Sequence, residues 1–210
     1  MVHIPYKGGG PAIAAVVAGD AQLTFGTPPS VLPMVQAGRL KALAVTSPNR
    51  TTLVPNVPGT IEAGLPGYSL SFWYGFFVPV GTPPEVMKKL FEAAQTVMQQ
   101  PEVKAALARE GTEVALSKSP PDGYTLLIAS PSSVSVNPSL NPKLTYMKDL
   151  APVTLLTSSP LVLAVNPGSD INSMQDLSTL AKAKPGSLNY TTSGNGSAPH
   201  LVWCCTLSDT

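Results

Sequence analysis

The chain has 210 residues, enough to bury a core as one large domain or as two small ones. Only 12% of the residues are charged and the formal net charge is +1, which excludes the basic surface that nucleic acid requires and the polybasic segment that binds acidic membranes. No apolar run reaches the roughly 20 residues of a membrane span. The first residues lack the charged and apolar segments of a signal peptide, so the sequence as written predicts a cytoplasmic protein.

The first 48 residues alternate short apolar segments with small helical ones. Strands are predicted at 2–6, 22–25 and 41–47, and helices at 11–19 and 30–38, each helix closing on a glycine. This β-α-β-α-β order predicts a parallel sheet.

The next segment leads from a surface loop into a long strand and two helices. Residues 48–67 are rich in Pro and Gly and are expected to lie on the surface. The aromatic run 68–80 predicts a strand that is buried or crosses between lobes, and it is the candidate hinge. Helices are predicted at 82–100, with Thr82 as its cap, and at 101–111.

A Pro-Asp-Gly turn at 121–123 opens a second α/β stretch. Ser173 and Asp176 have the spacing of a capping box at the start of its helix. The predicted elements are strands at 124–130, 152–157 and 160–165, a helix at 173–184, and a strand, Gly-rich loop and helix at 187–201.

Glycine-rich or small polar loops follow four of the predicted strands: "YKGGGPA" at 6–12, "FGTPPS" at 25–30, "ASPSS" at 129–133 and "TTSGNGSAPH" at 191–200. Backbone N–H groups and the helix dipole favour an anion at such a loop, and glycines let a ligand approach closely. For any one loop the alternative is a plain strand-to-helix turn. Open α/β sheets bind ligands where strands end, so the four together predict a polar pocket for a small anion.

The residues leave enzymatic activity open. His3 lies in a predicted strand and His200 in the first turn of a helix, positions that favour structural roles over that of a general base. His200 and Cys204 share a helix face, and with Cys205, Asp209 and His3 they form a candidate zinc set. Zinc there would give a promiscuous hydrolase of activated esters or phosphoesters, acting in a dimer. The alternative is an apolar tail with incidental cysteines and no cofactor.

Several long segments resemble one receptor family. They include "VHIPYKGGGPAIAAVVAGDAQLTFGTPPSVLPMVQAGRLKALAVTSPNR", "WYGFFVPVGTPPEVMKKL", "PPDGYTLLIASPSSVSVNPSL" and "AKAKPGSLNYTTSGNGSAPHL". These are similar to the extracytoplasmic solute-binding receptors of tripartite tricarboxylate transporters, the Bug family. The resemblance implies an α/β, periplasmic-binding-protein-like fold, in which two lobes with mainly parallel sheets are joined by crossing strands. It also implies a periplasmic, non-enzymatic protein that holds a small carboxylate in an inter-lobe cleft and passes it to a membrane transporter.

The order of the segments departs from the family. Residues 1–118 resemble the C-terminal part of such a receptor and residues 119–202 its N-terminal and middle part, whereas 203–210 form an atypical tail. The chain therefore resembles a permuted and incomplete receptor, with a seam at 117–127. The family's opening strand and first loop, a major part of its carboxylate site, have no counterpart, so we expect weakened binding.

The resemblance implies a set of ligand-binding residues on four loops and one strand. They are Tyr6, Lys7, Gly8, Gly9, Gly10, Gly26, Thr27, Trp73, Ser130, Ser132, Ser133, Ser193, Gly194, Asn195 and Gly196. A sheet that lacks its first strand exposes an edge and an apolar face, and such surfaces pair with another copy. We therefore expect a homodimer, in which segments can be exchanged between the chains.

Overall fold

The computed structural model describes residues 1–52, 54–109, 113–114, 127–131, 134, 139, 141, 143 and 146–208. The predicted turn at 121–123 and most of the seam lie outside the described residues. The chain divides into two compact units: unit 1 comprises Met1–Ser71 with Pro160–Thr210, and unit 2 comprises Phe72–Ser159.

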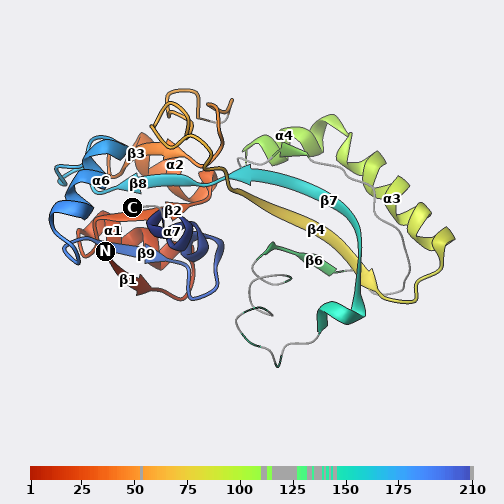
Figure 1. Cartoon of the computed structure of the whole chain (residues 1–210). Helices are drawn as coiled ribbons and strands as arrows, with labels where there is room; N and C mark the ends of the chain where they lie inside the picture. The colour runs from red at the N-terminus through yellow and green to blue at the C-terminus, as the bar shows by residue number, and fades with distance from the viewer. Residues whose placement is uncertain are drawn as a thin grey trace. The chain divides into compact units, whose positions relative to one another are not determined.

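Unit 1 is built on a five-stranded sheet (Figure 1). Its strands, in spatial order, are β1 (Val2–Pro5), β9 (Asn189–Thr192), β2 (Leu23–Gly26), β8 (Val162–Val165) and β3 (Lys41–Val45). β9 runs parallel to both of its neighbours, whereas β8 is antiparallel to β2 and β3. Four strands therefore point one way, and the strand from the far end of the sequence separates β1 from β2.

Helices cover both faces of this sheet. They are α1 (Gly9–Ala18), α2 (Pro28–Gln36), α6 (Met174–Ala183) and α7 (Ala198–Ser208). The hydroxyl of Thr191 on β9 donates to the Ala12 carbonyl of α1, whereas the ring of Tyr190, its neighbour on the strand, lies against Trp203 of α7. Because successive side chains of a strand point to opposite faces, α1 and α7 cover opposite sides of the sheet.

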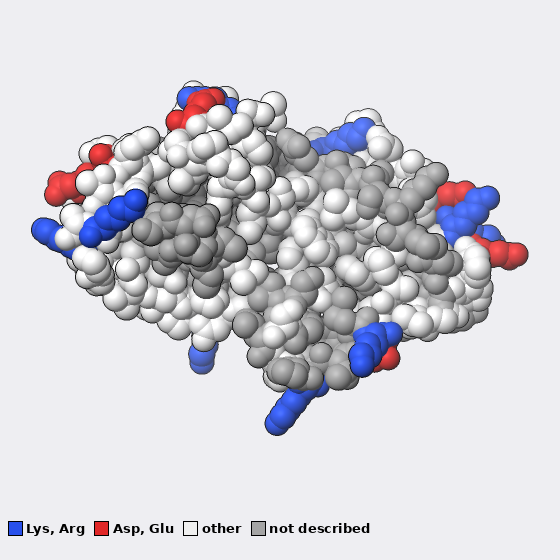
Figure 2. All heavy atoms as spheres, viewed as in Figure 1, with Lys and Arg blue, Asp and Glu red and all other residues white. Residues whose placement is uncertain are grey.

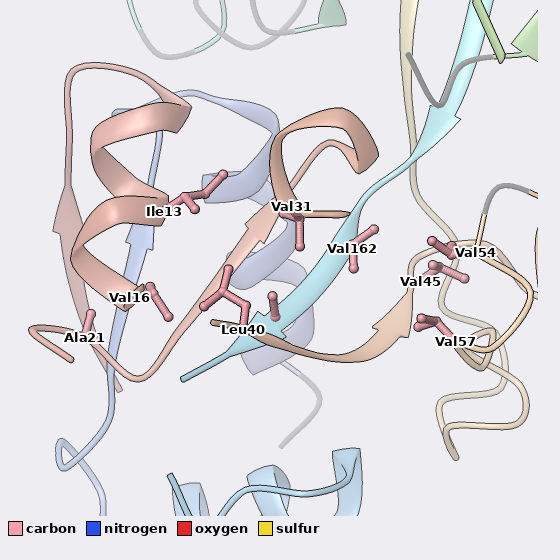
Figure 3. Packing of buried hydrophobic residues seen from close by; sticks show 10 residues of the cluster. Ile13, Val16, Ala21, Val31, Leu40, Val45, Val54, Val57 and Val162 are labelled. Atoms are coloured by element: carbon pink, nitrogen blue, oxygen red, sulfur yellow. The ribbon is translucent and has the colours of Figure 1, made fainter. Parts of the chain in front are cut away.

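The core of unit 1 packs α1 and α2 against the sheet and the loop that follows β3 (Figure 3). The buried residues of this cluster are aliphatic: Ile13, Val16, Ala21, Val31, Leu40, Val45, Val54, Val57, Val162 and Ala164. α1 ends where Gly19 takes a φ of 89°, a left-handed value that favours glycine. α6 begins at Ser173, whose hydroxyl oxygen accepts the Asp176 N–H at 3.1 Å, as the capping spacing predicts.

Unit 2 has a second sheet, ordered β5 (Glu113–Val114), β7 (Leu150–Pro160), β4 (Ser71–Pro79) and β6 (Leu127–Ala129). Helices α3 (Pro84–Met98) and α4 (Pro101–Arg109) and a 3-10 turn at Tyr146–Asp149 complete its described elements. Val78 of β4, Met87 of α3 and Val153 of β7 share one buried cluster. The expected cap of the helix at 82–100 is wrong: Pro83 precedes α3, and the Thr82 hydroxyl donates to the Pro79 carbonyl instead.

The α/β class and the incomplete two-part architecture agree with the sequence prediction. The sheets are less parallel than predicted. Unit 1 has a mixed sheet, in which β9 pairs in parallel with β1 and β2 and β8 pairs antiparallel with β2 and β3, and the described pairs β4–β6 and β5–β7 of unit 2 are antiparallel. The long strand predicted at 68–80 is β4, and the chain changes unit at its start and again at the end of β7. The sequence segments 1–118 and 119–202 are not these spatial units, and that division remains a prediction.

Within the described residues no helix is long and apolar enough to cross a membrane.

Candidate functional site

Three neighbouring strands of unit 1 each lead directly into a helix. β1, β9 and β2 run in the same direction and are followed by α1, α7 and α2, so the three helix N-termini meet at one edge of the sheet (Figure 1). Helix N-termini carry unpaired N–H groups and partial positive charge. This edge is the candidate site, and three of the four predicted polar loops form it.

The N-terminus of α1 presents free donors in open space. Gly8 has a φ of 117°, and the first helical bond runs from the Ala12 N–H to the Gly8 carbonyl. The N–H groups of Gly9 and Gly10 precede that bond and have no partner within the helix, while Pro11 contributes none. A Cβ added to Gly8, Gly9 or Gly10 would meet nothing within 4 Å. A ligand therefore has room to reach these two amides.

The loop 193–197 lies beside them and is tied down at both ends. The Gly8 N–H donates to the Ser193 carbonyl at 3.2 Å, which joins the loop to the start of α1. The Ser197 hydroxyl donates to the Gly194 carbonyl at 2.7 Å, and its oxygen accepts the His200 N–H at 3.4 Å. Asn195 is exposed at the tip of the loop.

The start of α2 offers less than the other two helices. Pro28 and Pro29 have no N–H, and the Ser30 N–H already donates to the Thr27 carbonyl. The Thr27 and Ser30 hydroxyls are also bonded to each other, at 3.0 Å. Gly26 is fixed by packing, because an added Cβ would lie 2.5 Å from Val31. α2 therefore contributes the positive end of its dipole to the site, rather than unpaired N–H donors.

Acidic residues are missing from the site and present elsewhere. The first turns of α1, α2 and α7 contain no Asp or Glu, whereas those of α3, α4 and α6 contain Glu85, Glu102 and Asp176. An acidic residue in the first turn offsets the positive end of a helix. Among the helices that the structure describes, those at this edge leave that charge uncompensated, and the exposed Lys7 adds a full positive charge next to α1.

The charges of the rest of the molecule do not form a large basic surface on the side drawn in Figure 2. The Lys and Arg side chains there are scattered over the surface, and several of them lie beside Asp or Glu side chains. The positive potential at the candidate site thus comes from backbone and Lys7 rather than from a basic patch. Such a site favours a small anion over a polyanion.

Trp73 and Ser130, two further residues predicted to bind the ligand, belong to unit 2. Trp73 on β4 is half-buried and packs against the cluster of Phe77, Ala129 and Val134. Ser130 follows β6, is half-buried, and its carbonyl accepts the Val134 N–H at 3.1 Å. Ser132 and Ser133 lie outside the described residues.

The candidate zinc ligands are only partly brought together. The rings of His3 and His200 stack with centroids 4.5 Å apart, so their planes are parallel rather than aimed at one point. Their nitrogens have other partners, the Thr192 hydroxyl and the Gly196 N–H. No group of three His, Cys, Asp or Glu side chains able to hold a metal occurs among the residues that the structure describes. Asp209 and the side chains of Cys204 and Cys205 lie outside that part.

Sequence reasoning expected a structural role for His200 but did not identify the residues that hold the loop together with it. Thr192, Ser197 and His200 bind the backbone of the loop 193–197. The three-residue spacing from Ser197 to His200, at the start of a helix, is the pattern of a hydroxyl cap and was the available signal.

The sequence model of the tripartite tricarboxylate transporter family receptor matches the chain twice, over residues 1–119 and 114–206. The chain belongs to this receptor family. A UPF0065 protein from the tcbD-tcbE intergenic region of Pseudomonas sp. strain P51 is 36% identical over 116 residues, which are 55% of this chain and 34% of that protein. Protein BugT of Bordetella pertussis is 35% identical over 108 residues, 51% of this chain and 33% of that relative.

A further receptor relative is a shorter protein. The UPF0065 protein from the clcB-clcD intergenic region of Pseudomonas knackmussii is 34% identical over 112 residues, 53% of this chain and 66% of that protein. The matches thus cover about a third to two thirds of the relatives' length. No solved structure matches the chain.

Proposed function

We propose that this receptor-family chain binds a small carboxylate at the shared edge of β1, β9 and β2, in the periplasm, and delivers it to a membrane transporter. The observation that carries the proposal is the absence of acidic residues from the first turns of α1, α2 and α7, in contrast to α3, α4 and α6. A negative charge is the natural complement of three uncompensated helix N-termini.

The α1 N-terminus supplies the main contacts in this proposal. The Gly9 and Gly10 N–H groups donate to the carboxylate oxygens, and Lys7 provides the charge. Hydrogen bonds to an ionised group contribute roughly 1.5–3 kcal/mol each. Tyr6, Thr27, Ser193 and Asn195 line the same edge in loops that follow the three strands.

The family resemblance implies further ligand-binding residues, Trp73, Ser130, Ser132 and Ser133, and we retain them in the proposal. We also propose that the order of the family's segments is permuted here. The two matched ranges overlap at 114–119, close to the seam, which supports a join of two receptor pieces.

Isothermal titration with small di- and tricarboxylates tests the binding function. The Lys7→Gln variant should bind about tenfold more weakly, because one charge-assisted contact is lost. Lys182→Gln, which removes an exposed lysine from the last turn of α6, is the matched control and should bind as the wild type does. Equal affinities of the two variants, or no binding of any carboxylate by the wild type, would contradict the proposal.

We propose, in addition, that two copies of the chain pair through unit 2. β6 is the last strand of its described sheet, and Ile128 on it is 64% exposed. An exposed apolar strand at a sheet edge is a template for another strand, and a second copy supplies one of matching sequence.

A further inference from the structure

His3 and His200 lie next to the candidate site as a stacked pair. Their ring planes differ by 21° and their centroids are 4.5 Å apart. His3 also stacks on Tyr190, at 5.0 Å, and Tyr190 lies 4.8 Å from Trp203, which is fully buried. The pair is therefore the outer end of a column of rings that begins in the core beside Phe25.

Each imidazole holds one end of the loop 193–197. The Nε2 atom of His3 lies 2.7 Å from the Thr192 hydroxyl, and that hydroxyl oxygen accepts the Gly194 N–H at 3.3 Å. The Nδ1 atom of His200 accepts the Gly196 N–H at 3.2 Å. Both glycine amides are thus turned toward the protein, and the backbone between them, with the exposed Asn195, is left to face a ligand.

We propose that His3 and His200 are positioning residues that clamp the loop 193–197 in its ligand-binding shape. This inference rests on the proposed function, because it assigns the loop to a carboxylate site. It requires no metal: the two rings act through their contacts with Thr192 and Gly196. Neither histidine touches the ligand in this scheme.

The clamp requires a neutral His200, since only an imidazole with a free Nδ1 lone pair can accept the Gly196 N–H. Burial lowers the pKa of His3, and the charge of a protonated His200 beside it lowers that pKa further. Tyr190 and Thr192 of β9 face the pair, and Cys204 and Cys205 follow His200 on α7.

Two pairs of isosteric variants test the clamp. Asn places an amide group near the Nδ1 position of a histidine, and Gln places one near Nε2. His200→Asn should therefore keep the Gly196 contact and His200→Gln should lose it, whereas His3→Gln should keep the Thr192 contact and His3→Asn should lose it. In each pair the member that loses the contact should bind a probe dicarboxylate, succinate, about tenfold more weakly, as the loss of one hydrogen bond implies.

A second measurement does not depend on the ligand. Amide hydrogen exchange at Gly196 in the free protein should be about tenfold faster in His200→Gln than in His200→Asn.

The possible failures are distinguishable. Equal affinities within both pairs, together with equal exchange at Gly196, would overturn the clamp even if the wild type binds succinate. If the wild type binds no carboxylate, the proposed function fails, and with it the binding role of the loop. The exchange rate at Gly196 would still decide whether the histidines hold the loop.

Discussion

The Gly8 N–H donates a 3.2 Å hydrogen bond to the Ser193 carbonyl, and this bond joins two loops that are far apart in the sequence. It places the start of α1 beside the loop that leads to α7. A change at Gly8 therefore affects stability and the candidate site together, whereas a change at its neighbour affects only the site.

Gly8→Ala should destabilise unit 1 by more than about 1 kcal/mol, because a φ of 117° is strained for a residue with a Cβ. Gly9→Ala is the matched control. An added Cβ there meets nothing within 4 Å, so stability should change by less than about 0.5 kcal/mol. Urea denaturation followed by circular dichroism measures the stability of both variants. Equal losses of stability would show that the strained φ of residue 8 is not the cause of the destabilisation.

Trp203 anchors α7 to the sheet. Its ring is fully buried between Phe25 and Tyr190, each with a centroid 4.8 Å away. Trp203→Ala should cost about 3–5 kcal/mol of unfolding free energy. Trp203→Phe should cost clearly less, because it keeps an aromatic ring and removes an indole N–H that has no partner among the described residues. Denaturant midpoints rank the variants, and a larger loss for Phe than for Ala would refute the packing argument.

Asp176 makes stability depend on pH in the acid range. The hydrogen bond from the Asn172 N–H, followed by that with the Ser173 hydroxyl, lowers the pKa of this carboxyl below its ordinary 3.8. A carboxyl whose pKa is lowered by folding stabilises the protein above its unfolded pKa, and that stability is lost as the pH falls through the folded pKa. Asp176→Asn should therefore be less stable than the wild type at pH 6, and the difference should shrink below about pH 3.8. A difference that is constant with pH would rule out titration of Asp176.

Self-association through unit 2 predicts a response to charge on β6. Ile128→Lys should shift the protein toward the monomer in sedimentation equilibrium, because a lysine on an edge strand opposes pairing. Ile61→Lys is a suitable control, since Ile61 is also exposed, at 53%, but lies in unit 1. A wild-type protein that is monomeric at all concentrations would disprove the dimer.

Local elements of the fold were predictable and the order of the sheet was not. The helix ending at Gly19 and the Ser173 cap follow from neighbouring residues, and both are confirmed. The insertion of β9 between β1 and β2 depends on pairing of distant segments, such as Val2 with Asn189, which periodicity does not encode. Thr82 failed as a cap because its hydroxyl has a nearer acceptor in the Pro79 carbonyl.

In the candidate site, too, local features were predictable from the sequence and the spatial arrangement of distant residues was not. The glycines of α1 and of the loop 193–197 were identified from their sequence pattern, and the structure brings both to one edge. His3 and His200 were paired as metal ligands, and the structure does bring them together, but as stacked rings. Residue type predicts what a side chain can bind, whereas ring orientation depends on the strand and helix that carry it.

The position of β9 in the sheet also affects how the protein forms on the ribosome. β1 is synthesised first, yet its only hydrogen-bonded neighbour among the described strands is β9. At about 5–20 residues per second, the interval between them is roughly 10–40 s. During that time the apolar segments of β1, α1 and β2 lack the strand that joins them, so the sheet of unit 1 cannot close until β9 has been made.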